Sequence, residues 1–128
     1  MIETAVYYLF LSVILVLYLS FLIIKQRKKH LVSVGSGGHD EIKYLMRAHG
    51  NALEYLPLFL IMLCVYDAND APAWAVHLFG MMMMVGRVLH AIAFVKYQSM
   101  ALKMRFWGMI LTFLSLILVA IANIIAVI

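Results

Sequence analysis

The chain has 128 residues, of which 66% are hydrophobic and 12% are charged, and its formal net charge is +4. A soluble domain of this length is about 45–50% apolar and about 25% charged, so the composition excludes a water-soluble enzyme and a nucleic-acid-binding module. One cysteine excludes an internal disulfide and a multi-cysteine metal site. At about 20 residues per membrane-spanning helix, the length accommodates four spans and about 40 residues of connection.

The apolar stretches predict an all-α fold, an integral membrane bundle of four transmembrane helices in up-down order. The first stretch is expected to be a retained helix, because it begins Met1-Ile2-Glu3 and lacks the small-residue cleavage site of a signal peptide. A glycine-rich loop follows it, and Pro72 is well placed to open the third helix. The helices are expected at residues 4–24, 42–66, 72–97 and 105–127 of a single domain covering 1–128.

The basic residues near the ends of the spans predict the orientation. They occur in the two links that follow the first and the third span: Lys25, Arg27, Lys28, Lys29, Lys43, Lys96, Lys103 and Arg105. The opposite side carries only the acids Glu3, Asp67 and Asp70. Because Lys and Arg are retained in the cytoplasm, both links are expected there and both termini outside. The positive charge is therefore a topology signal, and no nucleic-acid partner is expected.

The second and third predicted helices carry polar residues at membrane depth. Arg47, Asn51 and Glu54 are spaced i, i+4, i+7 and form one stripe, which Tyr55 borders. Arg87, His90 and Phe94 are spaced i, i+3, i+7 and also share a face. Ionisable groups are costly inside a bilayer, so such residues usually face protein and mark function.

These embedded charges allow two interpretations. Glu54 and Arg87 lie at similar depths, so they are expected to be able to pair, which would make them a purely structural contact between helices. That pairing leaves four residues unexplained: Arg47, His49, Asn51 and His90. With Arg105, the guanidinium groups collect around a polar cleft in the cytoplasmic half, and planar guanidiniums suit carboxylate recognition. A small anionic ligand entering from the cytoplasm fits this pattern.

Several motifs carry a family resemblance that spans nearly the whole chain. Residues 47–60, RAHGNALEYLPLFL, resemble the signature of the MAPEG family, the membrane-associated proteins in eicosanoid and glutathione metabolism. Residues 86–94, GRVLHAIAF, are similar to a segment of microsomal glutathione transferases. The loop 35–38 and residues 105–113, RFWGMILTF, resemble the bacterial inner-membrane branch.

The resemblance implies a homotrimer in the bacterial inner membrane, with both termini periplasmic. Glutathione, as co-substrate, would lie in a cleft between neighbouring subunits that opens to the cytoplasm. The residues implied to bind it are Arg47, Asn51, Glu54, Tyr55, Arg87 and His90, with Arg27 or Lys28 adding a cationic contact. Arg105 matches the arginine that stabilises the glutathione thiolate in the family. A nearby cation lowers the pKa of a thiol, and the thiolate is the nucleophile.

One departure from the family keeps several functions open. Phe94 stands where catalytic members carry a tyrosine. The first hypothesis is a glutathione transferase or peroxidase acting on a hydrophobic electrophile or lipid peroxide that arrives through the membrane lipid. The second is a non-catalytic member that binds glutathione or lipid and regulates a partner. A small multidrug transporter is less favoured, because the embedded acid Glu54 is surrounded by Arg47 and Arg87. No metal is expected, since the spacing of His49, Glu54 and His90 matches no ligand pattern.

Overall fold

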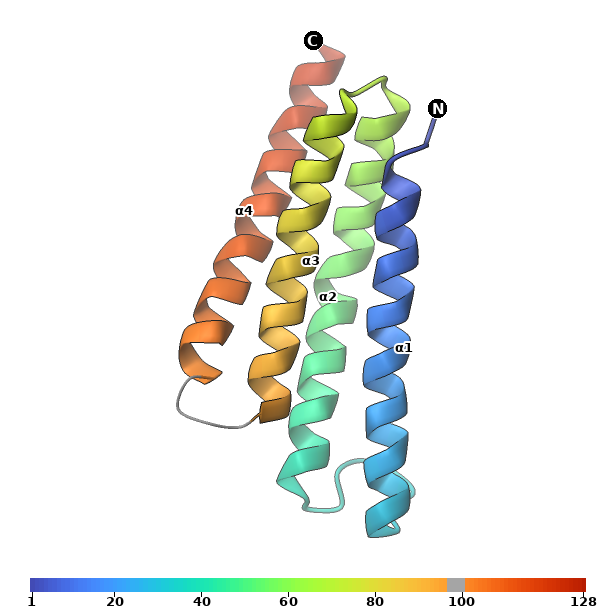
Figure 1. Ribbon diagram of the computed structural model, residues 1–128, viewed down its shortest axis with the longest axis vertical. Helices are drawn as coiled ribbons and strands as arrows, with labels where there is room; N and C mark the ends of the chain where they lie inside the picture. Colours follow the sequence, from blue (N-terminus) through green and yellow to red (C-terminus); the bar gives the residue numbers. More distant parts are fainter. Residues whose placement is uncertain (97–100) are drawn as a thin grey trace.

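The computed structural model describes residues 1–96 and 101–128, and this part of the chain contains four helices. Their bounds are α1 Ala5–His30, α2 Asp40–Ala68, α3 Ala73–Lys96 and α4 Ala101–Val127. The helices run alternately up and down, with both termini at one end of the bundle and the α1–α2 loop at the other (Figure 1). Each is long and apolar enough to cross a membrane. The predicted all-α membrane bundle is confirmed.

Three helices extend further at the loop end than the apolar stretches predicted: α1, α4, and α2, which begins at Asp40 rather than at 42. α1 continues through the basic run to His30 instead of ending at residue 24, because lysine and arginine are good helix formers and cations are favourable in the last helical turn. It then ends at Leu31, whose backbone is left-handed (φ 55°). α4 begins at Ala101 rather than at 105. The predicted end of the third helix at Tyr97 lies outside the described residues.

Helices α3 and α4 approach each other so closely that their backbones touch. A Cβ atom added to Gly86 would lie 2.9 Å from the carbonyl oxygen of Gly108, and one added to Gly108 would lie 2.8 Å from that of Gly86. Small residues at such crossings are characteristic of helix packing in membranes. This contact brings the polar face of α3, with Arg87 and His90, directly against α4.

A similar close contact joins α1 to α3 near the terminal end. The Tyr8 ring lies where a side chain at Gly80 would be, since a Cβ there would come within 2.5 Å of the ring. The Tyr8 hydroxyl lies 2.8 Å from His77 Nδ1 and 3.1 Å from the His77 carbonyl oxygen. The absence of a side chain at Gly80 therefore positions α1 on the bundle.

The start of α1 is held by a carboxylate from the end of α2. Asp67 is buried, and its Oδ2 accepts hydrogen bonds from the backbone N–H groups of Glu3, Thr4 and Ala5 at 2.8–2.9 Å. The first N–H groups of a helix have no partner within it, and negative charge is favourable beside them. Thr4 makes no side-chain cap. Asp67, expected only as an acid of the outer side, therefore caps α1 across 62 residues or more of sequence.

Replacing Asp67 with alanine should destabilise the terminal end of the bundle. Three backbone donors lose their shared acceptor, and the loss of a helix cap together with buried unsatisfied N–H groups costs about 2–3 kcal/mol. We expect a lower thermal unfolding temperature in detergent and faster hydrogen exchange of the amides of residues 3–5. Asp70→Ala is the matched control, because the Asp70 side chain is exposed. Equal losses of stability in both variants would contradict the capping role.

Candidate functional site

Arg87 is the centre of the polar cluster and is held by three helices. It lies on α3 with only 2% of its surface exposed. Its Nε donates to Thr112 Oγ1 on α4 at 2.9 Å, and its Nη1 donates to the carbonyl oxygen of Asn51 on α2 at 3.4 Å. The guanidinium also lies 5.1 Å from the centroid of the Tyr55 ring. The structure thus brings together three predicted site residues, although Asn51 contacts Arg87 through its backbone rather than its amide.

Two α4 residues that sequence reasoning missed complete the surroundings of Arg87. Thr112 accepts from Arg87 and donates its own hydroxyl hydrogen to the Gly108 carbonyl oxygen at 2.8 Å. Met109 Sδ lies 3.3 Å from Arg87 Nη2. Residues 106–128 carry no charge, so nothing in their hydropathy indicated a polar contact. The signal was a glycine and a threonine one helical turn apart, which together leave room for a neighbouring helix and offer it an acceptor.

Glu54 does not pair with Arg87 within the chain, so that expectation was wrong. Across residues 1–96 and 101–128, the ion pairs within 4 Å join the Met1 amino group to Asp70 and His30 to Glu41. Glu54 is instead exposed on the outer face of α2. Arg87 is therefore a buried cation that forms no ion pair within 4 Å with a carboxylate in the described part of the chain.

His90, Phe94 and Arg105 form the loop-side half of the cluster. His90 is buried, and its ring centroid lies 4.9 Å from that of Phe94. The Arg105 guanidinium from α4 lies over the Phe94 ring, with its Cζ 4.5 Å from the ring centroid. An arginine over an aromatic ring is held by cation–π attraction. Phe94 thereby links the predicted catalytic residue Arg105 to the buried face of α3.

Arg47 and Glu54 lie outside this cluster, on the exposed surface of α2. They are one repeat apart (i, i+7), and the same face continues toward the terminal end with exposed Leu58, Ile61 and Val65. Charged side chains that face lipid at membrane depth are costly. This stripe therefore combines two charges with a row of exposed aliphatic side chains on the surface of α2.

Arg27 lies on a different side of the chain, between α1 and α2. Its Nε donates to the Gly35 carbonyl oxygen at 3.1 Å, and its Nη2 lies 3.6 Å from Met46 Sδ. His49 is nearby, with its Nε2 2.9 Å from Ser20 Oγ. Arg27, Met46, His49 and Ser20 line one pocket of about 300 Å³. One chain therefore does not bring Arg27 to Arg87, and it presents two separate polar faces.

In the described ranges, no three His, Cys, Asp or Glu side chains come close enough together to hold a metal ion. The chemistry that the cluster offers is that of guanidinium groups: Arg87 and Arg105 can bind or stabilise an anion, and each lies over an aromatic ring, Tyr55 and Phe94 respectively.

Four membrane-spanning helices with an arginine cluster between the second, third and fourth define a small multi-pass membrane protein with an intramembrane polar site. The model of the MAPEG family matches residues 5–125, and the chain belongs to this family. It is similar to the inner membrane protein YecN of Escherichia coli, both from strain K12 and from strain O6:H1. Each is 33% identical over 116 residues, which cover 91% of this chain and 86% of the relative. The resemblance predicted from residues 47–60 is confirmed.

Proposed function

We propose that the protein binds glutathione between neighbouring subunits of a homotrimer and transfers it to, or uses it to reduce, a hydrophobic substrate. The observation that carries the proposal is Arg87, a buried guanidinium without a carboxylate partner in the described residues. A buried cation without a close ion pair in a membrane-spanning bundle favours an anionic ligand whose carboxylate can contact it.

The charges of Arg87 and of the exposed face of α2 complement those of glutathione. The tripeptide has two carboxylates and one ammonium group. Arg87 and Arg47 offer guanidiniums for the carboxylates, which bind in a bidentate manner, and Glu54 offers an acceptor for the ammonium. A purely cationic ligand would meet Arg47 and Arg87 and be repelled, which disfavours a transporter of cationic drugs.

The two polar faces of one chain support a site shared between subunits. One face carries Arg47 and Glu54, and the other carries Arg27 and His49. In a closed ring, one face of each subunit meets the other face of the next, so both are covered and no chain is left unpaired. Arg27 would then reach the glutathione of its neighbour. The ring size of three is the one that family membership implies.

Arg105 is the residue to which we assign thiolate stabilisation. A guanidinium beside the thiol of bound glutathione favours the ionised form, which is the nucleophile. In the transferase reaction, the sulfur lone pair forms a bond to the electrophilic carbon, and the leaving group departs with the electron pair of its own bond. The substrate would arrive from the membrane lipid. The loop end carries the basic residues, so we place it in the cytoplasm and both termini in the periplasm.

A non-catalytic role is the second candidate, and one contact favours it. The Arg105 guanidinium lies on the ring of Phe94, a residue that has no hydroxyl to orient a thiol. If this contact persists when ligand binds, Arg105 would be engaged by the protein itself. The chain would then bind glutathione without activating it and act through a partner.

Titration of glutathione into the detergent-solubilised protein separates these functions. Thiolate formation is followed by its ultraviolet absorbance, and an aryl-halide electrophile is added afterwards. The transferase proposal expects saturable binding, a rise in thiolate absorbance and formation of the conjugate. Binding without thiolate would favour the second candidate. Absence of glutathione binding would refute the transferase proposal.

Replacing Arg105 with alanine should spare glutathione binding and abolish thiolate formation. The carboxylates of the ligand would still meet Arg47 and Arg87, whereas the thiol would lose its cation. The measurement is the thiolate absorbance at saturating glutathione, together with the rate of aryl-halide conjugation. Lys103→Ala is the control, because it removes an exposed cation two residues away on α4. Normal conjugation by the Arg105 variant would show that the role is wrongly assigned.

A further inference from the structure

A polar pocket opens at the loop end, on the side of α2 that faces α1. Its volume is about 480 Å³, and three helices contribute to it. The lining residues are Leu22, Gln26 and Lys29 from α1, Asp40, Glu41, Tyr44 and Leu45 from α2, and Phe94 and Val95 from α3. Phe94 is the residue that this pocket shares with the arginine cluster, so the pocket lies beside the proposed glutathione site and is distinct from it.

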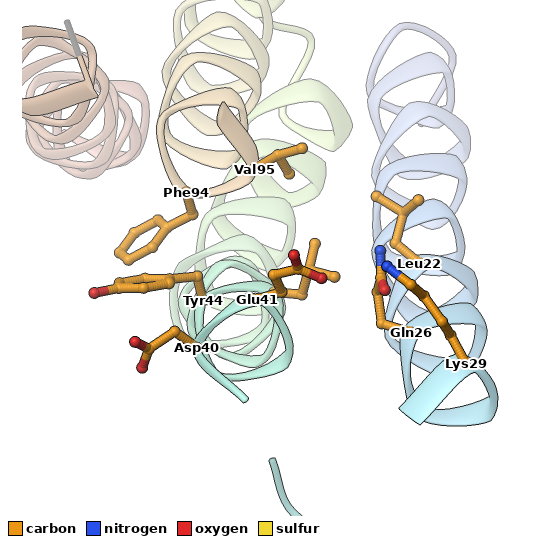
Figure 2. Close-up of a pocket in the computed structure, with 9 residues that line it drawn as sticks. Leu22, Gln26, Lys29, Asp40, Glu41, Tyr44, Phe94 and Val95 are labelled. Carbon is orange, nitrogen blue, oxygen red and sulfur yellow. The ribbon is translucent and has the colours of Figure 1, made fainter. Parts of the chain in front are cut away.

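Opposite charges face each other across this pocket without meeting. Figure 2 shows Gln26 and Lys29 directed from α1 toward Glu41 on α2. Among the described residues, Lys29 and Asp40 make no ion pair within 4 Å, and Glu41 pairs only with His30 at 3.6 Å. The Oε1 atom of Gln26 is buried and accepts no hydrogen bond. The pocket thus offers one cation on one wall, acceptors on both walls, and space between them.

An apolar groove continues from this pocket toward the middle of the bundle. It has a volume of about 450 Å³ between α1 and α3 and shares Val95 with the polar pocket. Its other lining residues are Leu11, Ile14, Leu15, Tyr18, Leu19, Met84, Val88, Ala91 and Ile92. From Leu22 to Leu11, α1 rises about 16 Å. Half of a typical hydrocarbon core is about 15 Å thick, so the groove matches the depth of one lipid leaflet.

We propose that the pocket and groove together bind one membrane phospholipid whose headgroup carries a primary ammonium, as in phosphatidylethanolamine. The ammonium donates hydrogen bonds to Glu41 and to the buried oxygen of Gln26, the phosphate lies against Lys29, and one acyl chain occupies the groove. Each unpaired group of the pocket then gains a partner of opposite charge or complementary hydrogen-bonding character.

The chemistry of the pocket selects this headgroup over the other common ones. A choline headgroup has the same charges but no N–H, so it would leave the Gln26 oxygen without a donor, and buried unsatisfied acceptors are costly. A glycerol headgroup has a phosphate but no cation, so Asp40 and Glu41 would repel it. The proposal is independent of glutathione, because neither Arg87 nor Arg105 lines the pocket.

Native mass spectrometry of the delipidated full-length protein in detergent tests the selectivity. The protein is titrated with phosphatidylethanolamine, phosphatidylcholine and phosphatidylglycerol that have identical acyl chains. We expect the ethanolamine lipid to bind about tenfold more tightly than the choline lipid, which is the effect of one charge-assisted hydrogen bond. Equal binding of these two lipids, or tighter binding of the glycerol lipid, would overturn the proposal.

Variants assign the preference to the pocket. Glu41→Gln should reduce the preference for the ethanolamine lipid over the choline lipid to about twofold or less. Lys29→Gln should weaken the binding of both lipids to a similar extent, because both carry the phosphate that Lys29 contacts. Lys28→Gln is the matched control, since Lys28 is exposed and does not line this pocket, and it should keep the preference. If loss of the His30 contact prevents Glu41→Gln from folding, Lys29→Gln still tests the assignment through the affinity for both lipids. An affinity for both lipids that is unchanged in Lys29→Gln would overturn the assignment. Displacement of the lipid by glutathione would also overturn it, because the pocket would then belong to glutathione.

Discussion

Replacing Arg87 with methionine is expected to abolish glutathione binding while leaving the bundle folded. Methionine keeps most of the side-chain volume and removes a buried cation that forms no ion pair within 4 Å with a described carboxylate. Exchanging a buried charge for an apolar residue of similar volume is often neutral or stabilising. The thermal unfolding temperature should therefore stay constant or rise. The ligand, by contrast, loses its desolvated partner, so its affinity should fall by at least about a hundredfold.

Isothermal titration calorimetry and thermal unfolding of the same detergent samples measure these two effects. Thr112→Val is the matched variant, because it removes the acceptor of Arg87 Nε but keeps the guanidinium. We expect it to bind glutathione more weakly than the wild type and more tightly than Arg87→Met. If Arg87→Met unfolds at a clearly lower temperature and still binds glutathione when folded, Arg87 is a structural contact and the ligand site lies elsewhere.

Replacing Gly108 with alanine should separate α3 from α4 and cause the largest loss of stability of the variants described. The added methyl group would meet backbone atoms, the Gly86 carbonyl oxygen at 2.8 Å and the His90 nitrogen at 3.0 Å, which cannot rotate away as a side chain can. Overpacking of this kind costs about 1–3 kcal/mol even where side chains can adjust, so we expect a loss at or above the upper end.

Thermal unfolding followed by circular dichroism measures this effect, and Gly50→Ala provides the control. Gly50 is also in the interior of a helix, yet nothing lies within 4 Å of an added Cβ. Alanine there should be neutral or stabilise the helix by up to about 1 kcal/mol, because glycine has the poorer helix propensity. Equal stability of the Gly108 and Gly50 variants would contradict the close approach of α3 and α4.

The four spans could be predicted from the sequence because apolar length alone determines what crosses a bilayer. The ends of the helices were harder to predict, because a basic run such as Lys25–His30 is compatible with either a helix or a loop until its neighbours in the fold are known. The cap from Asp67 to α1 joins residues 62 or more positions apart, and no local pattern reports such a contact. It depends on how the two helix ends meet in the bundle.

The sequence predicted which residues belong to the site better than it predicted the contacts between them. The i, i+3, i+7 spacing on α3 correctly placed Arg87, His90 and Phe94 on one face, because a helix has a fixed period. The partner of Arg87 was wrong, since similar depth on two helices does not ensure that side chains point toward each other. Thr112 was missed because an uncharged hydroxyl hardly changes the hydropathy of a span.

The carboxylate of Asp67 also determines where α1 can separate from the bundle. At the terminal end, moving α1 away would break the three hydrogen bonds to Asp67 and the contacts of Tyr8 with His77. At the loop end, α1 faces a space of about 480 Å³ that no ion pair from Lys29 closes in the described part of the chain, but His30 and Ser20 still join α1 to Glu41 and His49 of α2 there. Loss of the Asp67 carboxylate would therefore release the first turn of α1 from the end of α2, while α1 stays joined to α2 in its basic half.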